Sequence, residues 1–259
     1  MTGTGALSIG VAAAVGPELA ARLAPAIEAA GFHALWVNDT PGSDALAVLA
    51  AAARETESLV LATGVVPVDR RPPAEILDRV SALALPEDRL LLGIGSGGRR
   101  EGALALVADA AAALRAGSSA RVVIGALGPK MRRLGAAASD GLLLSWLTPD
   151  VAARQTDAAH EVAADAHVAV YVRTALDADA GPRLEREAAA YASYPAYAAN
   201  FARLGIEALD TVIRPDQGAR IAAYRASADE VVLRAITAGE TADDYLRFVD
   251  AARAAAAAR

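Results

Sequence analysis

Residues 59–66, Leu-Val-Leu-Ala-Thr-Gly-Val-Val, and residues 90–94, Leu-Leu-Leu-Gly-Ile, decide the fold class. Both runs are short and continuously apolar, which is typical of strands buried on both faces of a parallel sheet. The segment between them, 73–84, begins with proline and is predicted to be a helix. The two runs therefore predict a strand–helix–strand unit.

The same unit recurs along the chain. Strands are expected at 7–12, 34–37, 59–66, 90–94, 121–124, 141–145, 168–174 and 230–236. Helices are expected at 17–30, 43–54, 73–84, 101–115, 129–138, 149–164 and 183–204, and from 241 to the C-terminus. Eight even units favour an α/β fold of the closed (β/α)8 TIM-barrel type, with one domain over residues 1–259. A doubly wound open sheet is the less favoured alternative, and segment 205–228 is expected to wrap the barrel before the last strand.

The composition narrows the class of protein. Lysine and arginine total 25 against 31 acidic residues, a formal net charge of −6, which argues against a binder of duplex nucleic acid. The chain has no cysteine, so disulfides and thiolate chemistry are excluded. The most apolar run, 59–68, is about half as long as a membrane-spanning helix. We expect a cytoplasmic protein that acts on a small molecule, without nucleic-acid or membrane partners.

In a TIM barrel the chemistry lies at the carboxyl ends of the strands. Those ends carry Ala12 and Ala13, Asn38 and Asp39, residues 64–67, 95–98 and 125–128, Ser145 and Trp146, Arg173 and Thr174, and Arg234 and Thr237. Glycine recurs at three of them, where it allows a bulge or the close approach of a flat ligand, although such turns also favour glycine for its own sake. Trp146 either walls a planar ligand or caps the barrel rim.

Residues 93–98, Gly-Ile-Gly-Ser-Gly-Gly, match the G-x-G-x-x-G pattern of dinucleotide-binding loops. The motif falls in the fourth unit rather than the first, and the next strand ends in Gly125 rather than an acid, which disfavours a Rossmann-type site. A loop that approaches a phosphate or a ring remains an alternative interpretation, because successive amides can face an anion.

Residues 69–71, Asp-Arg-Arg, either neutralise an anionic tail or pair with one another.

Neither a metal site nor covalent catalysis is expected. His33 and His167 fall near strand starts and His160 falls within a helix, and no acidic cluster accompanies them. The same placement argues against a serine–histidine triad. Lys130, the single lysine, begins a helix instead of ending a strand, which disfavours Schiff-base chemistry.

Seven blocks along the chain share one likeness. They are Gly-Phe-His-Ala-Leu-Trp-Val at 31–37, Ala-Thr-Gly-Val-Val-Pro at 62–67 with Arg-Pro-Pro at 71–73, Leu-Gly-Ile-Gly-Ser-Gly at 92–97, Ile-Gly-Ala-Leu-Gly-Pro-Lys-Met at 124–131, Ala-Ser-Asp-Gly at 138–141, Trp-Leu-Thr-Pro at 146–149 and Asp-Glu-Val-Val-Leu-Arg-Ala at 229–235. Together they resemble the bacterial luciferase-like superfamily of flavin- and deazaflavin-dependent oxidoreductases, in that family's order. The blocks at 124–131 and 146–149 look most like the branch that uses coenzyme F420.

The resemblance implies a luciferase-like barrel in which a hydride passes between a small organic substrate and C5 of F420. An FMN-dependent monooxygenase or reductase on the same fold is a second interpretation. A barrel that binds a cofactor without turnover is a third. The resemblance also implies a homodimer, which alanine-rich helix faces would suit.

By position, the resemblance implies that Asn38 and Asp39 are the catalytic residues beside the ring or the substrate, and that a non-prolyl cis peptide, Gly64–Val65, supports the ring. Residues 95–97 would line the side chain of the cofactor, and amides at 125–128 would lie near its phosphate, ahead of a helix whose positive end favours that anion. With Trp146 as the possible wall, the candidate cofactor-binding residues are Gly64, Val65, Gly95, Ser96, Gly97, Gly125, Ala126, Gly128 and Trp146.

The chain departs from the family where a proton must be moved. Relatives often carry histidine or glutamate at the ends of the first two strands, where this chain has Ala12-Ala13 and Thr40 after Asp39. Asp39 is then the best acid and Arg173 the best cation. The connection between the fourth and fifth strands is short where many relatives cover the substrate, so we expect an open mouth, with water or the substrate as proton donor.

Overall fold

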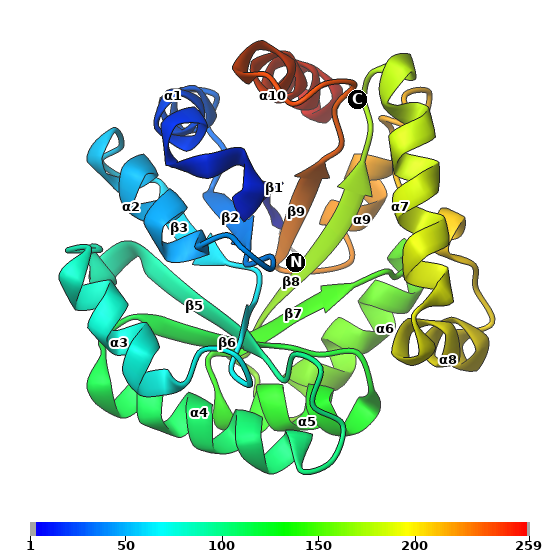
Figure 1. Cartoon of the computed structure of the whole chain (residues 1–259). Coiled ribbons are helices and arrows are strands. Elements are labelled where there is room, and N and C mark those ends of the chain that lie inside the picture. The colour runs from blue at the N-terminus through cyan, green and yellow to red at the C-terminus, as the bar shows by residue number, and fades with distance from the viewer. Residues whose placement is uncertain (1–3, 258–259) are drawn as a thin grey trace.

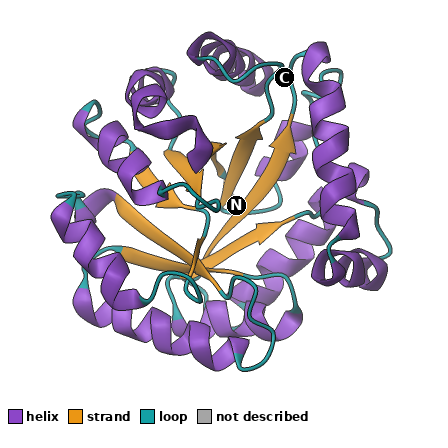
Figure 2. Cartoon of the chain, in the orientation of Figure 1, coloured by secondary structure: helices purple, strands orange, loops and turns teal. Residues whose placement is uncertain are grey.

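The computed structural model of the protein describes residues 4–257, in which eight parallel strand positions close into a barrel inside a ring of helices (Figure 1 and Figure 2). The strands are hydrogen-bonded in the order β3-β2-β1-β9-β8-β7-β6-β5-β4, and a further pairing of β3 with β5 completes the circle. The structure therefore confirms the (β/α)8 TIM barrel.

The strands are β1 Ala6–Ala12, β2 Ala34–Asn38, β3 Val60–Thr63, β4 Val66–Pro67, β5 Leu90–Gly95, β6 Arg121–Gly125, β7 Gly141–Ser145, β8 His167–Thr174 and β9 Glu230–Ala235. The helices are α1 Gly16–Ala29, α2 Ala45–Arg54, α3 Pro73–Ala82, α4 Ala103–Gly117, α5 Pro129–Ala138, α6 Pro149–His160, α7 Gly181–Ser193, α8 Pro195–Leu204, α9 Arg220–Arg225 and α10 Ala242–Ala257. Segment 205–228 contains a short 3-10 turn, Ala208–Thr211, and α9.

The third predicted strand, 59–66, is divided into β3 and β4. The intervening Gly64–Val65 bond is cis, which confirms the expectation for that bond. β3 pairs with β2 and, through Leu61 and Ala62, with β5, whereas β4 pairs with β5 further along, where Val66 lies opposite Ile94. The two halves therefore occupy one strand position of the barrel.

The predicted helix at 183–204 is two helices, α7 and α8, which meet at Tyr194. Pro195 has no backbone N–H and disfavours helical angles in the residue before it. Tyr194 accordingly has an extended backbone, with φ −74° and ψ 125°. This break changes the direction of the chain, so that residues of both helices reach the carboxyl end of the barrel.

Side chains alternate between the barrel interior and the surrounding layer. Ala34, Trp36, Ala62, Leu91, Val123, Leu143, Ala169, Tyr171 and Val232 form the interior cluster. On β8, Ala169 and Tyr171 lie inside, whereas Val168, Val170 and Val172 pack in the larger cluster between strands and helices. This two-residue period is that of a strand. Every second side chain of β8 therefore points into the barrel, and the later ones, Tyr171 and Arg173, reach the cavity at its carboxyl end.

A buried carboxylate joins four strands at the amino-terminal end of the barrel. Glu230, which is 1% exposed, accepts hydrogen bonds from Ser8 Oγ at 2.5 Å and Trp36 Nε1 at 2.6 Å. Its second oxygen lies 2.8 Å from His167 Nε2. Burial opposes ionisation of Glu230, but the hydrogen bonds from His167, Ser8 and Trp36 outweigh it and hold its pKa below the usual value. The cluster therefore ties β9 to β1, β2 and β8.

We predict that Glu230→Ala lowers the free energy of unfolding by about 3 kcal/mol, because it removes the buried acceptor for these groups. Urea titration followed by tryptophan fluorescence measures this change. Glu185→Ala, at an exposed position of α7, is the matched control and should change stability by less than about 0.5 kcal/mol. Equal stabilities for the two variants would contradict the prediction.

We also predict that this contribution depends on pH. Because the folded-state pKa of Glu230 lies below its usual value of 4.5, the stabilisation is complete above that value and declines as the pH falls through the folded pKa. The difference in unfolding free energy between the parent and Glu230→Gln should therefore shrink between about pH 7 and about pH 3.5. Urea titrations at the two pH values check this, and a constant difference would count against it.

Candidate active site

A cavity of about 980 Å³ lies at the carboxyl ends of the strands. Loop residues after the strands form most of its wall, and α7 and α8 contribute Glu187, Tyr191, Tyr197, Asn200 and Arg203. Active sites of TIM-barrel enzymes lie at this end, and the volume suits an organic cofactor together with a small substrate.

All but one of the predicted site residues line this cavity. They are Asn38, Asp39, Gly64, Val65, Gly95, Ser96, Gly97, Gly125, Ala126 and Gly128. Trp146 is not among the lining residues, because its ring is buried behind Arg173 and packs against Tyr191 and Phe201. Of the two roles open to Trp146, this placement fits the structural one.

Val65 sits over the ends of two strands. A methyl group added to Gly95 would lie 2.8 Å from Val65 Cγ2, and one added to Gly125 would lie 2.9 Å from Val65 Cγ1. Real side chains do not approach so closely, so Val65 occupies the space that side chains at 95 and 125 would need. We call Val65 with these two glycines the Val65 platform. The glycines at these strand ends are explained by the seating of this one side chain.

Asn38 connects the platform to β8. Its Nδ2 donates to the carbonyl oxygen of Gly64, and its Oδ1 accepts a hydrogen bond from the Tyr171 hydroxyl. Burial raises the pKa of Tyr171, while the positive charges of Arg234 and Arg173 act in the opposite sense. Tyr171 therefore keeps its proton at neutral pH and orients the Asn38 amide.

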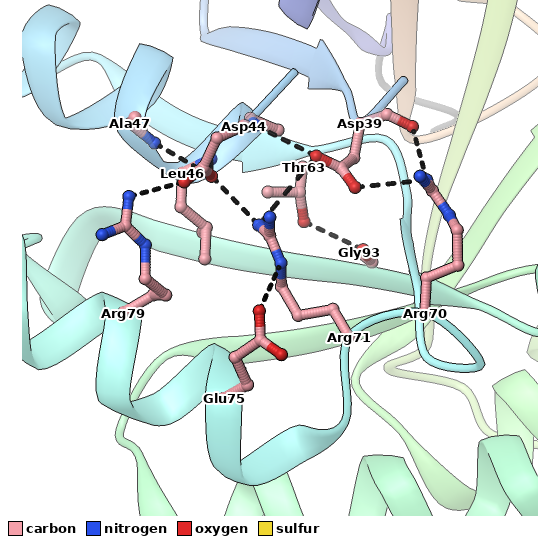
Figure 3. A network of polar contacts seen from close by, with 11 residues as sticks. Asp39, Asp44, Leu46, Ala47, Thr63, Arg70, Arg71, Glu75, Arg79 and Gly93 are labelled. Atoms are coloured by element: carbon pink, nitrogen blue, oxygen red, sulfur yellow. Dashed lines mark hydrogen bonds and ion pairs between the residues drawn. The ribbon is translucent and has the colours of Figure 1, made fainter. Parts of the chain in front are cut away.

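Asp39 belongs to a network of polar contacts that joins the loops after β2 and β4 (Figure 3). Its carboxylate accepts the backbone N–H of Ala45 at 3.1 Å and lies 3.4 Å from Arg70 Nη2. Arg71 Nη1 is 4.0 Å from the same carboxylate. The side chain of Asp39 is only 4% exposed, so these internal partners take most of its hydrogen-bonding capacity.

Asp44 is the second carboxylate of the network. It caps α2 by accepting the backbone N–H groups of Leu46 at 3.0 Å and Ala47 at 3.3 Å. It also pairs with Arg71 at 3.0 Å and Arg79 at 2.5 Å. Partial burial opposes ionisation of Asp44, but the bonds from Arg79 and Arg71 prevail and lower its pKa. Arg70 and Arg71 are thus paired with acids of the β2–α2 connection rather than with Asp69, and Arg71 Nε also pairs with Glu75 of α3 at 3.3 Å.

The anion at the glycine loop is the protein's own Asp69. The backbone N–H of Gly98 donates to Asp69 Oδ2 at 2.9 Å. A methyl group on Gly97, whose φ is +60°, would lie 1.9 Å from Asp69 Oδ1. A phosphate placed at the Gly98 amide would be repelled by that carboxylate. The loop therefore lines the cavity but is not its anion site.

Two arginines meet at the carbonyl oxygen of Leu127, which lines the cavity; Arg203 lines the cavity as well, and Arg132 lies behind it. Arg132 Nη1 donates to the Leu127 carbonyl oxygen at 2.8 Å, and Arg203 Nη2 lies 3.5 Å from the same oxygen. Burial and the charge of Arg203 lower the pKa of Arg132. Within residues 4–257 neither guanidinium forms an ion pair. Together with the N-terminus of α5, these two arginines form what we call the cationic end of the cavity, which favours an anionic group.

Arg173, the cation expected from the sequence, is held tightly inside the wall. Its Nε donates to Glu187 at 3.1 Å and its Nη1 to Ser145 Oγ at 2.7 Å. Its guanidinium carbon lies 4.2 Å from the centre of the Trp146 ring and 4.6 Å from that of Tyr191. Because a carboxylate and two aromatic faces compensate its charge, Arg173 mainly holds α7 against β8.

Two parts of the wall are absent from the sequence-based site. Tyr171 could have been found by alternation, since it lies two residues before Arg173 on β8. No motif marks the α7–α8 wall, whose residues line the cavity, and the connection from β5 to α4 is limited to residues 96–102. Two polar atoms at the wall, Asn200 Nδ2 and Thr40 Oγ1, have no hydrogen-bond partner within residues 4–257. Unpartnered polar atoms suit a polar ligand.

The histidines lie away from this cavity. His160 contacts Asp229 at 3.0 Å, and His167 contacts Glu230, both at the starts of strands. Among residues 4–257 no group of three or more histidine, aspartate or glutamate side chains is placed to hold a metal ion.

In the same part of the chain no helix combines the length and apolarity needed to cross a membrane.

Comparison with known proteins confirms the resemblance to the luciferase-like superfamily. The luciferase-like monooxygenase family matches residues 4–105. A search of curated proteins by sequence finds no match. Among solved structures, the coenzyme F420-dependent tetrahydromethanopterin reductase of Methanopyrus kandleri aligns with a TM-score of 0.76 at 16% identity, over 95% of this chain and 97% of that one.

Two further structures are similar in fold. An F420-dependent secondary alcohol dehydrogenase, in complex with an F420–acetone adduct, aligns with a TM-score of 0.70 at 14% identity, over 96% of this chain and 99% of that one. The FMN-bound oxygenating constituent of 3,6-diketocamphane monooxygenase from Pseudomonas putida also has a TM-score of 0.70 and 14% identity, over 95% and 96% of the two chains. The fold is thus shared by oxidoreductases and monooxygenases that bind F420 or FMN.

We predict that Asp44→Ala lowers the free energy of unfolding by about 2 kcal/mol, because it removes the cap of α2 and two partly buried ion pairs. Urea denaturation measures the loss. Asp78→Ala, at an exposed position on α3, changes the same residue type without touching the network and should be nearly neutral. If Asp44→Ala were as stable as Asp78→Ala, the network would not hold these loops.

Proposed function

We propose that this luciferase-like chain is an oxidoreductase that uses the deazaflavin F420 to transfer a hydride to or from a small organic substrate. The observation that carries the proposal is the pairing of the Val65 platform with the cationic end in one cavity. An apolar platform suits one face of a planar ring system, and the cationic end suits a phosphate linked to that ring. The likeness to two F420-dependent enzymes adds support at the level of fold.

The residues present fit such a cofactor. Val65 would contact the ring, and residues 95–97 would contact its side chain, next to the Gly98 amide that already donates to Asp69. Arg203 and the backbone at Gly128 would bind the phosphate, since a side chain built on Gly128 meets open space. Asn200 Nδ2, unpartnered within residues 4–257, would donate to the same part of the ligand. When bound, a deazaflavin supplies or accepts a hydride at C5, and the substrate exchanges one further proton with water.

Asn38 and Asp39 take different parts in this proposal. Asn38 faces the cavity between Gly64 and Tyr171 and would position the substrate against the ring. Asp39 is held by Ala45 and Arg70, so we assign it the task of fixing the loop that carries Asn38. From the sequence, Asp39 is the best candidate for the acid that donates the proton. Its contacts with Ala45 and Arg70 favour a positioning role instead, which leaves water as the proton source.

An FMN-dependent monooxygenase or reductase is the second candidate, favoured by the FMN-bound structure, whose TM-score equals that of the F420-dependent dehydrogenase. Both cofactors carry a phosphate, so the cationic end does not separate them. Separate titrations of the protein with F420, FMN and FAD, each followed by fluorescence, decide between the two. Tighter binding of FMN than of F420 would overturn the F420 proposal. Binding without any redox change, across a panel of alcohols, aldehydes and enones, would favour a protein that holds the cofactor without turnover.

We predict that Arg203→Met weakens the binding of F420, or of FMN if that is the cofactor, by roughly five- to tenfold, because it removes one charged hydrogen-bond donor from the phosphate. Riboflavin, which has the ring system of FMN but no phosphate, should bind the parent and this variant equally. Arg133→Met, at an exposed position on α5, controls for the change in net charge. An equal loss for riboflavin, or none for the phosphorylated ligand, would place the phosphate elsewhere.

A further inference from the structure

Arg234 is a charged residue of the cavity that the proposed cofactor site does not use. It lies near the end of β9, opposite Gly10 of β1 and Arg173 of β8. In the strand order, β9 is four positions from β5 around the barrel. Arg234 therefore faces the cavity from the side opposite the glycine loop at 95–98.

A second, smaller cavity of about 160 Å³ adjoins the first at Arg234. The two cavities share Ala12, Glu187 and Arg234 as lining residues. On the β1 side the smaller cavity is bounded by Ala12, Ala14 and Val15, whose apolar side chains offer no hydrogen-bond partner to the arginine. Arg234 thus stands where a ligand in the main cavity would extend into the smaller one.

The charge of Arg234 is not compensated in the described part of the chain. The neighbouring Arg173 pairs with Glu187 at 3.1 Å, and Arg183 pairs with Glu240 at 2.5 Å. Arg234 instead donates to the carbonyl oxygen of the next residue, Ala235, and forms no ion pair within residues 4–257. A half-buried guanidinium has strong directional donors for a carboxylate or phosphate, so an anionic ligand would satisfy it.

We propose that Arg234 binds a carboxylate carried by the substrate and that the smaller cavity receives this end of the molecule. The carboxylate is favoured over a phosphate because Glu187 and Glu240 are already paired with Arg173 and Arg183, which leaves Arg234 as one positive charge for a ligand with one negative charge. The rest of the substrate would then extend past Ala12 into the main cavity, toward Asn38. Calling this molecule the substrate rests on the proposed function, whereas the anion site itself does not.

Ligand-observed NMR, which detects millimolar affinities, tests the proposal on the protein with and without cofactor. The probes are propionate, crotonate and benzoate, each paired with its primary amide, together with methyl phosphate. We expect at least one acid to bind about tenfold more tightly than its amide, the difference of one charge-assisted hydrogen-bonded pair. Arg234→Met should abolish that preference, and Arg234→Lys should restore part of it. Arg186→Met, at an exposed position on α7, should leave it unchanged.

Three outcomes would overturn the proposal. Equal binding of every acid and its amide by the parent would remove the anion site, and this comparison does not depend on the folding of any variant. An acid preference that survives in folded Arg234→Met would place the site elsewhere. Binding of methyl phosphate as tight as that of the best acid would overturn the choice of a carboxylate. A parent protein that binds F420 but binds every acid no more tightly than its amide would refute this inference alone, whereas an acid preference without F420 or FMN binding would refute the proposed function alone.

Discussion

The close meeting of β3 and β5 is the contact on which the barrel and its site depend. A methyl group on Gly93 would lie 1.9 Å from the Thr63 carbonyl oxygen, so the two backbones touch at a point where no side chain fits. The Thr63 hydroxyl donates to the Gly93 carbonyl oxygen at 2.9 Å and fixes this contact (Figure 3). The chain leaves β3 at this point and rejoins the sheet as β4, and the displaced residue Val65 then lies over Gly95 and Gly125. The closure of the sheet and the platform of the site are therefore two results of the same contact.

Most acidic side chains described at this end of the barrel form hydrogen bonds or ion pairs with other groups of the protein. Asp69 occupies the glycine loop, Asp39 and Asp44 hold the arginines after β4, and Glu187 holds Arg173. Of the arginines that line the cavity, Arg203 on α8 and Arg234 on β9 form no ion pair within residues 4–257. The lining residues include acids as well as bases, but the acids are paired with groups of the protein itself. The site therefore favours anionic ligands.

Much of this arrangement could be predicted from the sequence, because it follows from local patterns. Continuous apolar runs predicted strands whose ends fall within one residue of those observed, except at 59–66, where the run predicted one strand and only the family resemblance implied the cis bond at Gly64–Val65. The strand-end residues reached the cavity because parallel strands bring their carboxyl ends together. Periodicity also explains Tyr171, which alternation on β8 places beside Arg173 on the inner face.

The remaining features depend on contacts between distant residues. Nothing local to Asp69 shows that it will meet the amide of Gly98, 29 residues away. Pro195 marks a break between two helices in the sequence, but nothing local to it predicts the direction in which α8 runs. Trp146 has φ +58° and turns behind Arg173, a backbone conformation that no propensity of tryptophan would predict. In each case the tertiary contact, and not the residue type, decides the role.

Arg203 and Arg234, which have no ion-pair partner in the described part of the chain, have a kinetic consequence, because the chain as a whole carries a formal charge of −6. An anionic ligand is repelled by the molecule at long range and attracted only when it is close to Arg203 or Arg234. Salt screens the long-range repulsion within about 8–10 Å in physiological buffers, while contacts inside a cavity are screened much less. Moderate salt should therefore speed the entry of an anion while weakening its final affinity only slightly, the reverse of what a uniformly basic binding surface produces.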